Sequence, residues 1–260
     1  MRNQLDLRKI NRKQLDRKIR VAAVSYLNTK PLIYGFEQGM MKDKIDLITD
    51  FPAKIADMLV KDETDISLVP VATIPLLEEY HIITDYCIGA DGAVASVCLF
   101  SDVPMEKIST ILLDYQSRSS VALLRILLRD HWKISPQLLQ GGEGYEEQIS
   151  GSVAGLVIGD RAFIQRKNRK YIYDLGLAWK ALTGLPFVFA AWIANKKLPE
   201  TFISEFNNAT AEGFKHLPAI ISANSYAHYD LEEYYTKNIS FGLDDEKRKG
   251  LEEFLRKVKK

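Results

Sequence analysis

The sequence is poor in the residues that build metal centres and disulfide frameworks. It has 260 residues but only two cysteines and four histidines, and it contains neither a CxxC pair nor an HExxH segment. Protein zinc sites are usually built from Cys and His at such short spacings, so we expect no metal site. Cys87 and Cys98 both lie in apolar, strand-like segments, which favours two reduced, buried thiols over a disulfide.

Signatures of nucleotide-binding proteins and of serine hydrolases are missing as well. No GxGxxG segment follows the first apolar stretch, and neither GxxxxGK[ST] nor GxSxG occurs. Such segments form the glycine-rich loops that hold phosphates and the sharp turn that carries a nucleophilic serine. We therefore expect neither a dinucleotide nor a nucleoside triphosphate as the ligand.

Charge of one sign and long apolar runs are also scarce. The formal net charge is +1, and 47% of the residues are hydrophobic. A nearly neutral chain has no strong field that attracts nucleic acid or a membrane surface, and no apolar run approaches the roughly 20 residues of a membrane span. The first apolar stretch, residues 21–27, resembles a core strand rather than a secretory signal. We expect a cytoplasmic protein without nucleic-acid or membrane partners, and the composition leaves its oligomeric state open.

The one charge bias lies at the N-terminus. Residues 2–20 contain eight Lys or Arg residues but only two Asp residues. A basic arm can contact nucleic acid, but we favour a solvated extension over residues 1–19. Deleting residues 1–17 is accordingly expected to leave activity and melting temperature nearly unchanged.

After the arm, strand-like and helix-like segments alternate. Residues 19–27 and 44–52 are apolar and rich in β-branched residues, as in buried strands, whereas residues 53–61 show helical spacing. Pro31 suits the first turn of a helix that runs to about Gln38. This alternation predicts an α/β fold with a parallel sheet.

Two long apolar strands bracket a central α/β block. The first covers residues 84–101 and is interrupted by Gly89 and Gly92, and the second covers residues 185–195. This pattern is typical of a chain that crosses from one lobe to another and later returns. A protein with two such crossovers binds its ligand in the cleft between the lobes.

Polar side chains follow the first predicted strand, at the strand end where ligands gather in open α/β sheets. They are Ser25, Tyr26 and Asn28. Asn28 can donate and accept hydrogen bonds to a ligand, or it can cap the helix that follows. The residue type by itself does not choose between these roles.

A second polar cluster follows the strand-like segment 108–116. Ser117, Arg118, Ser119 and Ser120 stand at a predicted helix start. Free backbone N–H groups and the helix dipole favour a carboxylate there, and an arginine can bind it in bidentate fashion. The alternative is a capping serine beside a surface arginine, and we favour the anion site.

Two further positions are weaker candidates. Asp160 follows an apolar strand within residues 151–163, where helix capping is the simpler interpretation. Ser96 follows Gly89 and Gly92, and these glycines are also compatible with a plain hinge loop. Together the four clusters offer hydroxyls, an amide and one arginine, which suit a small anion but include no strong general base.

In order and spacing, these segments resemble the chorismate dehydratase family of the futalosine route to menaquinone. The resemblance runs from about residue 20 to the end. The segments that carry it are SYLNTKPL (25–32), GADGAVASVCLFS (89–101), LDYQSRSSVALLRILL (113–128), GLVIGDRA (155–162), DLGLAWKALTGLPFVFAAWIA (174–194) and YYTKNISFGL (234–243).

This resemblance implies the class II periplasmic-binding-protein fold and dehydration of chorismate to 3-[(1-carboxyvinyl)oxy]benzoate, without a metal or organic cofactor. Lobe I would hold residues 20–98 and 190–260, and lobe II residues 99–189. Asn28 would match the family's essential Asn and Ser96 its second active-site polar residue. The substrate's enolpyruvyl carboxylate is thought to take the ring proton in this family, which would account for the missing protein base. We expect the substrate to contact Ser25, Tyr26, Ser117, Arg118, Ser119, Ser120 and Asp160.

Two other functions compete with this one. The sister family of the same pathway, which releases 1,4-dihydroxy-6-naphthoate, has a Cys- and Asp-Thr-rich first segment and a histidine in its site, and residues 25–31 match neither feature. A solute-binding protein would share the fold without chemistry, but we see no export signal or lipid-anchor cysteine at the start of the chain. A ligand-sensing domain fused to a DNA-binding element is disfavoured because the basic arm is too short for a helix-turn-helix.

Overall fold

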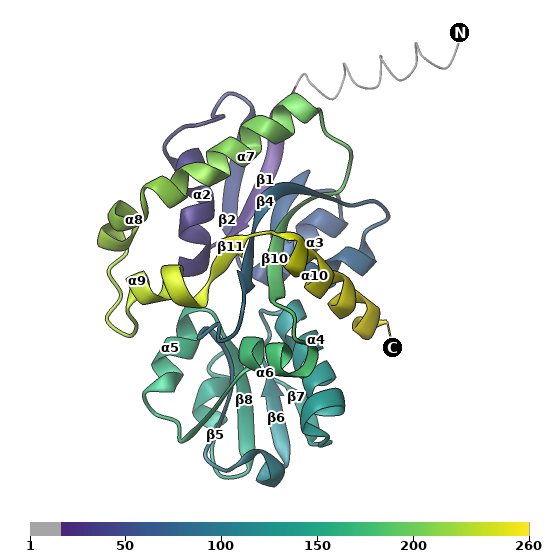
Figure 1. The fold of residues 1–260 in the computed structure, drawn as a ribbon, viewed down its shortest axis with the longest axis vertical. Helices are drawn as coiled ribbons and strands as arrows, with labels where there is room; N and C mark the ends of the chain where they lie inside the picture. The colour runs from purple at the N-terminus through teal and green to yellow at the C-terminus, as the bar shows by residue number, and fades with distance from the viewer. Residues whose placement is uncertain (1–16, 260) are drawn as a thin grey trace.

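The structure, a computed structural model, describes residues 17–259, which form two lobes that are each built around a β-sheet (Figure 1). The first sheet has the strand order β11-β4-β10-β3-β1-β2, and the second has the order β7-β6-β8-β5-β9. The strands of the first sheet are β1 (Ile19–Val24), β2 (Ile45–Asp50), β3 (Ile66–Pro70), β4 (His81–Ala90), β10 (Phe187–Ala194) and β11 (Ser240–Gly242). Those of the second sheet are β5 (Val97–Ser101), β6 (Thr110–Leu113), β7 (Gln137–Gln140), β8 (Val153–Ile158) and β9 (Tyr171–Asp174).

Helices pack around both sheets, and short helical turns connect several strands to them. The α-helices are α2 (Lys30–Glu37), α3 (Pro52–Val60), α4 (Arg118–Leu127), α5 (Asp160–Arg166), α6 (Leu175–Thr183), α7 (Glu200–Lys215), α8 (Leu217–Ala223), α9 (Leu231–Glu233) and α10 (Asp245–Val258). The 3-10 turns are η1 (Leu27–Thr29), η2 (Val71–Leu76), η3 (Met105–Lys107) and η5 (Tyr145–Gln148), and the π-helical turns are η4 (Leu128–Trp132) and η6 (Tyr234–Asn238).

Strand β1 lies inside the first sheet and points its carboxyl end at the second lobe. It pairs in parallel with β2 and β3, and its last four residues are fully or almost fully buried. The predicted buried parallel strand is thus confirmed. Strand β10 is antiparallel to both β3 and β4, so the sheet as a whole is mixed. Pro31 lies in the first turn of α2, as predicted.

The chain crosses between the lobes twice. It leaves the first sheet after Ala90 and enters the second at Val97, then leaves α6 after Thr183 and re-enters the first sheet at Phe187. The boundary expected between residues 98 and 99 therefore falls inside β5, and the one between 189 and 190 falls inside β10. Since a strand belongs to the sheet it pairs with, we propose that the first lobe ends at Ala90 and resumes at Phe187, and that the second lobe runs from Val97 to Thr183.

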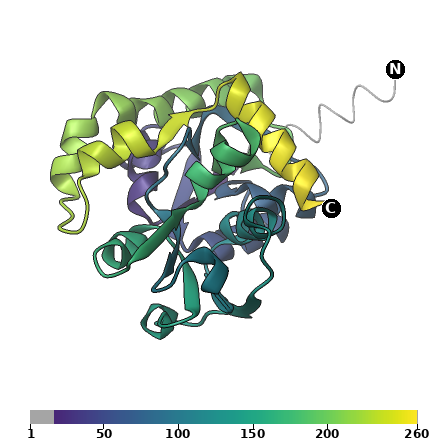
Figure 2. The same ribbon diagram turned by 60° about the horizontal axis from the view of Figure 1, so that its bottom comes forward.

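The C-terminal helix also reaches across to the second lobe. Figures 1 and 2 show α10 running from the first lobe toward α4. Near its end, Lys257 forms an ion pair with Asp130 of η4, with 2.9 Å between Nζ and Oδ2. This contact holds the two lobes together at a point away from both crossovers.

The basic arm is attached to the body at its carboxyl end. Residues 1–16 lie outside the described part of the chain, but Arg17 makes a bidentate ion pair with Asp65, at 2.7 and 2.8 Å. Asp65 is completely buried and also pairs with Arg20 and Lys196. The arm was expected to be free through residue 19. That expectation is wrong for residues 17–19, because a buried carboxylate needs cationic partners and Ile19 begins β1. Deleting residues 1–17 would also remove Arg17 from Asp65, so a deletion that includes Arg17 is now expected to lower the melting temperature.

Both cysteines are buried free thiols, as predicted. Cys87 and Cys98 lie on different sheets, and burial raises the pKa of the Cys87 thiol to about 12, so it stays protonated at neutral pH. Over residues 17–259, no helix combines the length and the apolar character needed to cross a membrane.

Candidate functional site

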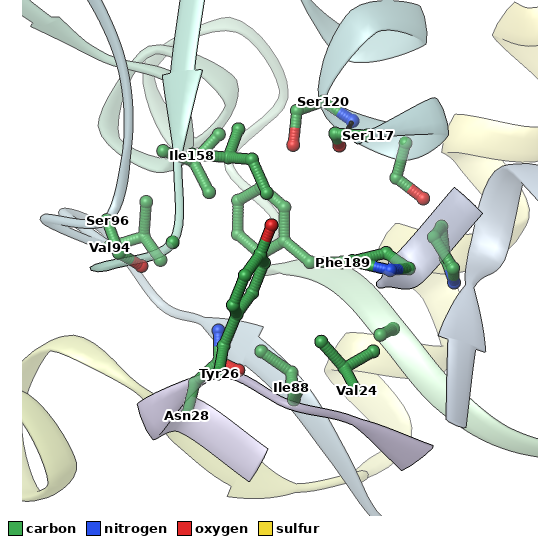
Figure 3. A pocket seen from close by; sticks show the side chains of 16 residues that line it. Val24, Tyr26, Asn28, Ile88, Val94, Ser96, Ser117, Ser120, Ile158 and Phe189 are labelled. Carbon is green, nitrogen blue, oxygen red and sulfur yellow. Dashed lines mark hydrogen bonds between the residues drawn. The ribbon is translucent and has the colours of Figure 1, made fainter. Parts of the chain in front are cut away.

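A cavity lies between the lobes at the carboxyl end of β1. Its space amounts to about 500 Å³, including the part that is open to solvent. Its lining comes from both lobes and the first crossover and is mainly apolar, with a few hydroxyl and amide groups (Figure 3). The lining residues are Val24, Tyr26, Asn28, Pro52, Pro70, Ile88, Val94, Ser96, Val97, Ser117, Ser119, Ser120, Ile158, Gly159, Phe189 and Ala190.

Asn28 is presented to the cavity by the turn η1. It is 9% exposed, and its Oδ1 accepts a weak hydrogen bond of 3.4 Å from Thr29 Oγ1. The N-cap positions of η1 and α2 are Tyr26 and Thr29, so Asn28 does not cap either helix. The capping alternative for Asn28 is therefore wrong, and a polar amide stands at the edge of a largely apolar cavity.

Ser96 lines the same cavity as Asn28, although the two are far apart in the sequence, and Tyr234 contacts both. The Tyr234 hydroxyl donates a hydrogen bond of 2.8 Å to Ser96 Oγ. Burial raises the pKa of Tyr234, while its hydrogen-bonding contacts with Ser96 and Asn28 act against that shift. Tyr234 therefore remains a neutral hydroxyl. Because Ser96 Oγ accepts from it, Ser96 can donate its own hydrogen to a ligand.

Tyr234 is a site residue that the sequence reasoning missed. It is fully buried and stands at the start of η6, a π-helical turn of the kind that often marks functional sites. Its neighbour Tyr235 donates a 2.9 Å hydrogen bond to the carbonyl of Leu27, so η6 holds η1 as well as Ser96. The only signal in the sequence was the position of Tyr234 in the segment YYTKNISFGL.

The amino end of α4 faces the cavity from the second lobe. Ser117 caps this helix by accepting a 3.2 Å hydrogen bond from the backbone N–H of Ser120, as expected of a serine at a helix start. Ser119 Oγ accepts 3.1 Å from the backbone N–H of Ala72 in the first lobe. Figure 3 shows Ser117 and Ser120 across the cavity from Asn28. Hydroxyls and a helix dipole thus point into one end of the cavity.

Arg118 does not line the cavity. Its guanidinium forms an ion pair with Asp57 of α3, in the first lobe, and both side chains are partly exposed. Neither Ser25, whose side chain is exposed, nor Asp160 is among the lining residues. Of the expected site residues, the structure thus brings together Tyr26, Asn28, Ser96, Ser117, Ser119 and Ser120, and it leaves Ser25, Arg118 and Asp160 outside.

Tyr26 crosses from the first lobe to a polar network in the second. Its hydroxyl donates to Gln116 Oε1, and Gln116 also accepts from Arg161 at 3.4 Å. Arg161 is held by Asp114 at 2.7 Å, and that carboxylate is almost completely buried. The sequence reasoning did not single out Gln116, Asp114 or Arg161 for these roles. Burial raises the pKa of Tyr26, so its hydroxyl remains a donor.

Gly159 is required where Tyr26 enters the second lobe. Its φ is +64°, and a Cβ on it would lie 2.9 Å from the Tyr26 ring. A side chain there would meet both backbone strain and a steric clash. Glycine therefore allows Tyr26 to pass close to the backbone between β8 and α5.

Asp160 joins the lobes just outside the cavity. Its carboxylate accepts from the backbone N–H of Leu27 at 3.2 and 3.4 Å, and its own carbonyl accepts from Tyr226 at 2.9 Å. Burial raises the pKa of Asp160 to about 6, and the Leu27 bond partly offsets this rise. Gly159, and not Asp160, holds the N-cap position of α5. The capping interpretation is thus wrong, and Asp160 is a contact between lobes.

The chemistry available in the cavity follows from its lining. No charged side chain is among the lining residues of this cavity. Neutral donors stand at two places, Asn28 with Ser96 on one side and the α4 serines on the other, and apolar surface lies between them. Such a site can orient a small anion with an apolar ring and can stabilise a departing oxygen, but it brings no strong base to a substrate proton.

Comparisons with known proteins agree with this architecture. The model of a family described as menaquinone biosynthesis matches residues 19–260. A chorismate dehydratase of Thermus thermophilus is 27% identical over 226 residues, which are 78% of this chain and 83% of that protein.

Solved structures support the fold. A protein from Archaeoglobus fulgidus superposes with a TM-score of 0.72 at 13% identity, covering 93% of this chain and 97% of its own. A Candida albicans gene product, described as having the generic periplasmic binding protein fold, has a TM-score of 0.61 at 14% identity and coverages of 94% and 90%. The aliphatic sulphonate binding protein of Escherichia coli has a TM-score of 0.55 at 14% identity and coverages of 92% and 87%. The predicted two-lobed periplasmic-binding-protein-like fold is confirmed.

Proposed function

Since the chain belongs to the menaquinone biosynthesis family, we propose that it dehydrates chorismate to 3-[(1-carboxyvinyl)oxy]benzoate. The observation that carries this proposal is that two neutral hydrogen-bonding side chains, Asn28 and Ser96, line a cavity with no charged lining residue, and that the buried Tyr234 contacts both. The similarity to a chorismate dehydratase points to the same substrate.

The reaction needs orientation more than acid–base strength. A proton leaves the ring carbon that carries the enolpyruvyl ether, and a hydroxide leaves the adjacent carbon, so the products are water and an aromatic ring. This elimination of water is redox-neutral, so it needs no electron acceptor. Aromatisation makes this step strongly downhill, and the remaining barrier lies in holding the reactive pose and stabilising the leaving oxygen.

The cavity offers a place for each part of the substrate. The apolar side chains Ile88, Ile158 and Phe189 would contact the ring. A carboxylate would take hydrogen bonds from the amino end of α4, where Ser117 and Ser120 lie. The leaving hydroxyl would accept from Asn28 and Ser96, which are preorganised by Tyr234.

None of the residues that line the cavity has a basic side chain that could accept the ring proton. Asp160 has a pKa of about 6, but it lies outside the lining and its oxygens are engaged by Leu27. An enolpyruvyl carboxylate of the substrate carries the required basicity and is bonded to the same ring carbon through its ether. We therefore propose that the substrate takes its own ring proton while Asn28 and Ser96 assist the departing oxygen.

Incubation of the purified protein with chorismate tests the proposal. We expect an aromatic product that is lighter than chorismate by one water, detected by mass spectrometry. Binding of chorismate in a thermal-shift assay without any product would favour a solute-binding role instead. If chorismate neither binds nor reacts, the protein acts on another substrate, and the precursor of 1,4-dihydroxy-6-naphthoate is the next one to test.

A further inference from the structure

The backbone that carries Ser96 is strained. Ala95 has a φ of +63°, in the left-handed region that non-glycine residues seldom occupy. The N–H of Ser96 donates a 2.8 Å hydrogen bond to the carbonyl of Val94, which closes a three-residue turn around Ala95. Turns of this kind with positive φ are rare and disfavoured in isolation. The surrounding structure must therefore impose it.

The carboxylate of Asp174 supplies that restraint. Its Oδ2 accepts from the N–H of Ala95 at 2.8 Å, and its Oδ1 accepts from the N–H of Val94 at 3.1 Å. The same Oδ1 caps α6 by accepting from Gly176 at 3.0 Å and Leu177 at 3.1 Å. One carboxylate thus ties the strained turn to the first turn of a helix in the second lobe.

The rest of the crossover also docks on α6. A Cβ on Gly176 would lie 2.5 Å from the carbonyl oxygen of Gly92, which shows how closely the two backbones approach. Lys180 forms a 2.6 Å ion pair with Asp91 at the start of the crossover. The segment is therefore fixed against α6 along its length, and Asp174 acts at the turn itself.

The position of this turn decides where Ser96 Oγ stands. Ser96 meets the hydroxyl of Tyr234 at 2.8 Å across the lobe boundary, so a relaxed turn would move Oγ out of that hydrogen bond. Asp174 does not line the cavity. We propose that Asp174 is a positioning residue for the dehydration, which holds Ala95 in its left-handed conformation so that Ser96 faces the leaving oxygen. This inference rests on the proposed function.

Asp174→Asn tests the proposal. The amide keeps one acceptor oxygen for the cap of α6, so we expect a folded protein, but it cannot accept at both the cap and Ala95. We expect kcat for chorismate to fall at least about tenfold, because an unrestrained alanine disfavours the left-handed conformation by about this factor. KM should stay within about twofold of the wild-type value. Asp244→Asn is the matched control. Asp244 caps α10 through a 2.8 Å bond from the Lys247 N–H and makes no hydrogen bond to the turn at Ala95, and we expect kcat of this variant to be unchanged.

Ala95→Gly supplies the rescue. Glycine adopts positive φ without strain, so adding Ala95→Gly to Asp174→Asn should restore kcat to within about threefold of the wild-type value. Asp174→Asn with near-normal kcat would overturn the proposal. A loss of kcat that Ala95→Gly does not relieve would also overturn it, since Asp174 would then act in another way than through the turn.

Amide hydrogen exchange at Ala95 and Ser96 separates this proposal from the proposed function. It needs no substrate. We expect faster exchange in Asp174→Asn and recovery in the double variant, and unchanged exchange in Asp174→Asn would contradict the role of Asp174. If the wild-type protein does not convert chorismate, the proposed function fails, and the exchange rates still decide whether Asp174 holds the turn.

Discussion

Replacing Asn28 by Asp changes the charge of the proposed site while keeping its shape. The amide is 9% exposed and faces a cavity without charged lining residues. An ionised carboxyl in its place would lose the donor for the leaving oxygen and would oppose an anionic substrate. At about pH 8 we expect Asn28→Asp to lose at least about two orders of magnitude in kcat, as when a preorganised donor is removed.

Asp160 gives a scale for the pKa of the introduced carboxyl. Burial raises the pKa of Asp160 from 3.8 to about 6, even though the N–H of Leu27 stabilises its charge. Position 28 is also buried, so a carboxyl introduced there is expected to have a raised pKa as well. A shift of this size corresponds to about 3 kcal/mol of destabilisation above that pKa.

The sign of this linkage predicts recovery at low pH. The folded-state pKa of the introduced acid is raised, so its destabilisation is complete above the folded pKa, shrinks as the pH falls below that pKa, and vanishes only below the pKa of an unfolded aspartate, about 3.9. The protonated carboxyl is also neutral and can donate again. We expect kcat of Asn28→Asp to approach that of the wild-type protein toward about pH 5, whereas its melting temperature should recover only in part there, each relative to the wild-type value at the same pH.

Asn28→Leu is the control for this experiment. Leucine has a similar volume but neither a charge nor a donor, so its kcat relative to the wild-type protein should stay low and independent of pH. The measurement is kcat with chorismate between about pH 5 and pH 8, with thermal melts at each pH. Near-normal turnover by folded Asn28→Asp at pH 8 would remove Asn28 from the mechanism. Parallel pH profiles for the two variants would refute the role of the charge.

Three further substitutions test other parts of the structure. Tyr234→Phe leaves Ser96 Oγ without its hydrogen-bond donor, and we expect kcat to fall about tenfold with little change in KM. The free energy of unfolding, measured by denaturant titration, should fall by about 1 kcal/mol. Arg118→Ala removes a partly exposed ion pair with Asp57 outside the cavity, so KM should rise less than about fivefold; a rise of a hundredfold would show that Arg118 binds the substrate directly. Asp65→Asn removes a buried carboxylate whose pKa is held far below its usual range by three cations, and we expect about 2 kcal/mol of lost stability, or about 4–8 °C in Tm. The difference from the wild-type protein should persist at neutral pH and vanish only when acid protonates that carboxylate, well below its usual pKa.

Several features of this protein can be read from the sequence because they depend on neighbouring residues. The apolar run before Ser25 predicts β1, and Pro31 predicts the start of α2, since strand burial and the first turn of a helix are local properties. Ser117 caps α4, which is also a local property, although the sequence analysis favoured an anion site with Arg118 over this capping alternative. The long interrupted strand and the later apolar strand indicate the two crossovers, within a few residues of where the chain makes them.

The short strands β7, β9 and β11 escaped the sequence analysis. They have three or four residues each and are only partly apolar, so they lack a hydrophobic period. Each is a strand because a neighbouring strand offers it backbone hydrogen bonds: β6, β5 and β4, respectively. Their existence is a property of the assembled sheets.

The proposed site also has some features that the sequence predicts and others that depend on the tertiary structure. The sequence by itself determined that Asn28 follows a strand, which is where a ligand meets an α/β sheet, and that Ser96 lies in an interrupted strand-like segment. Only the tertiary structure decided that Tyr234 joins them and that Arg118 turns to Asp57. These contacts link residues far apart in the chain, from different lobes, and their geometry is set by how closely the two sheets approach, which no local pattern of residues encodes.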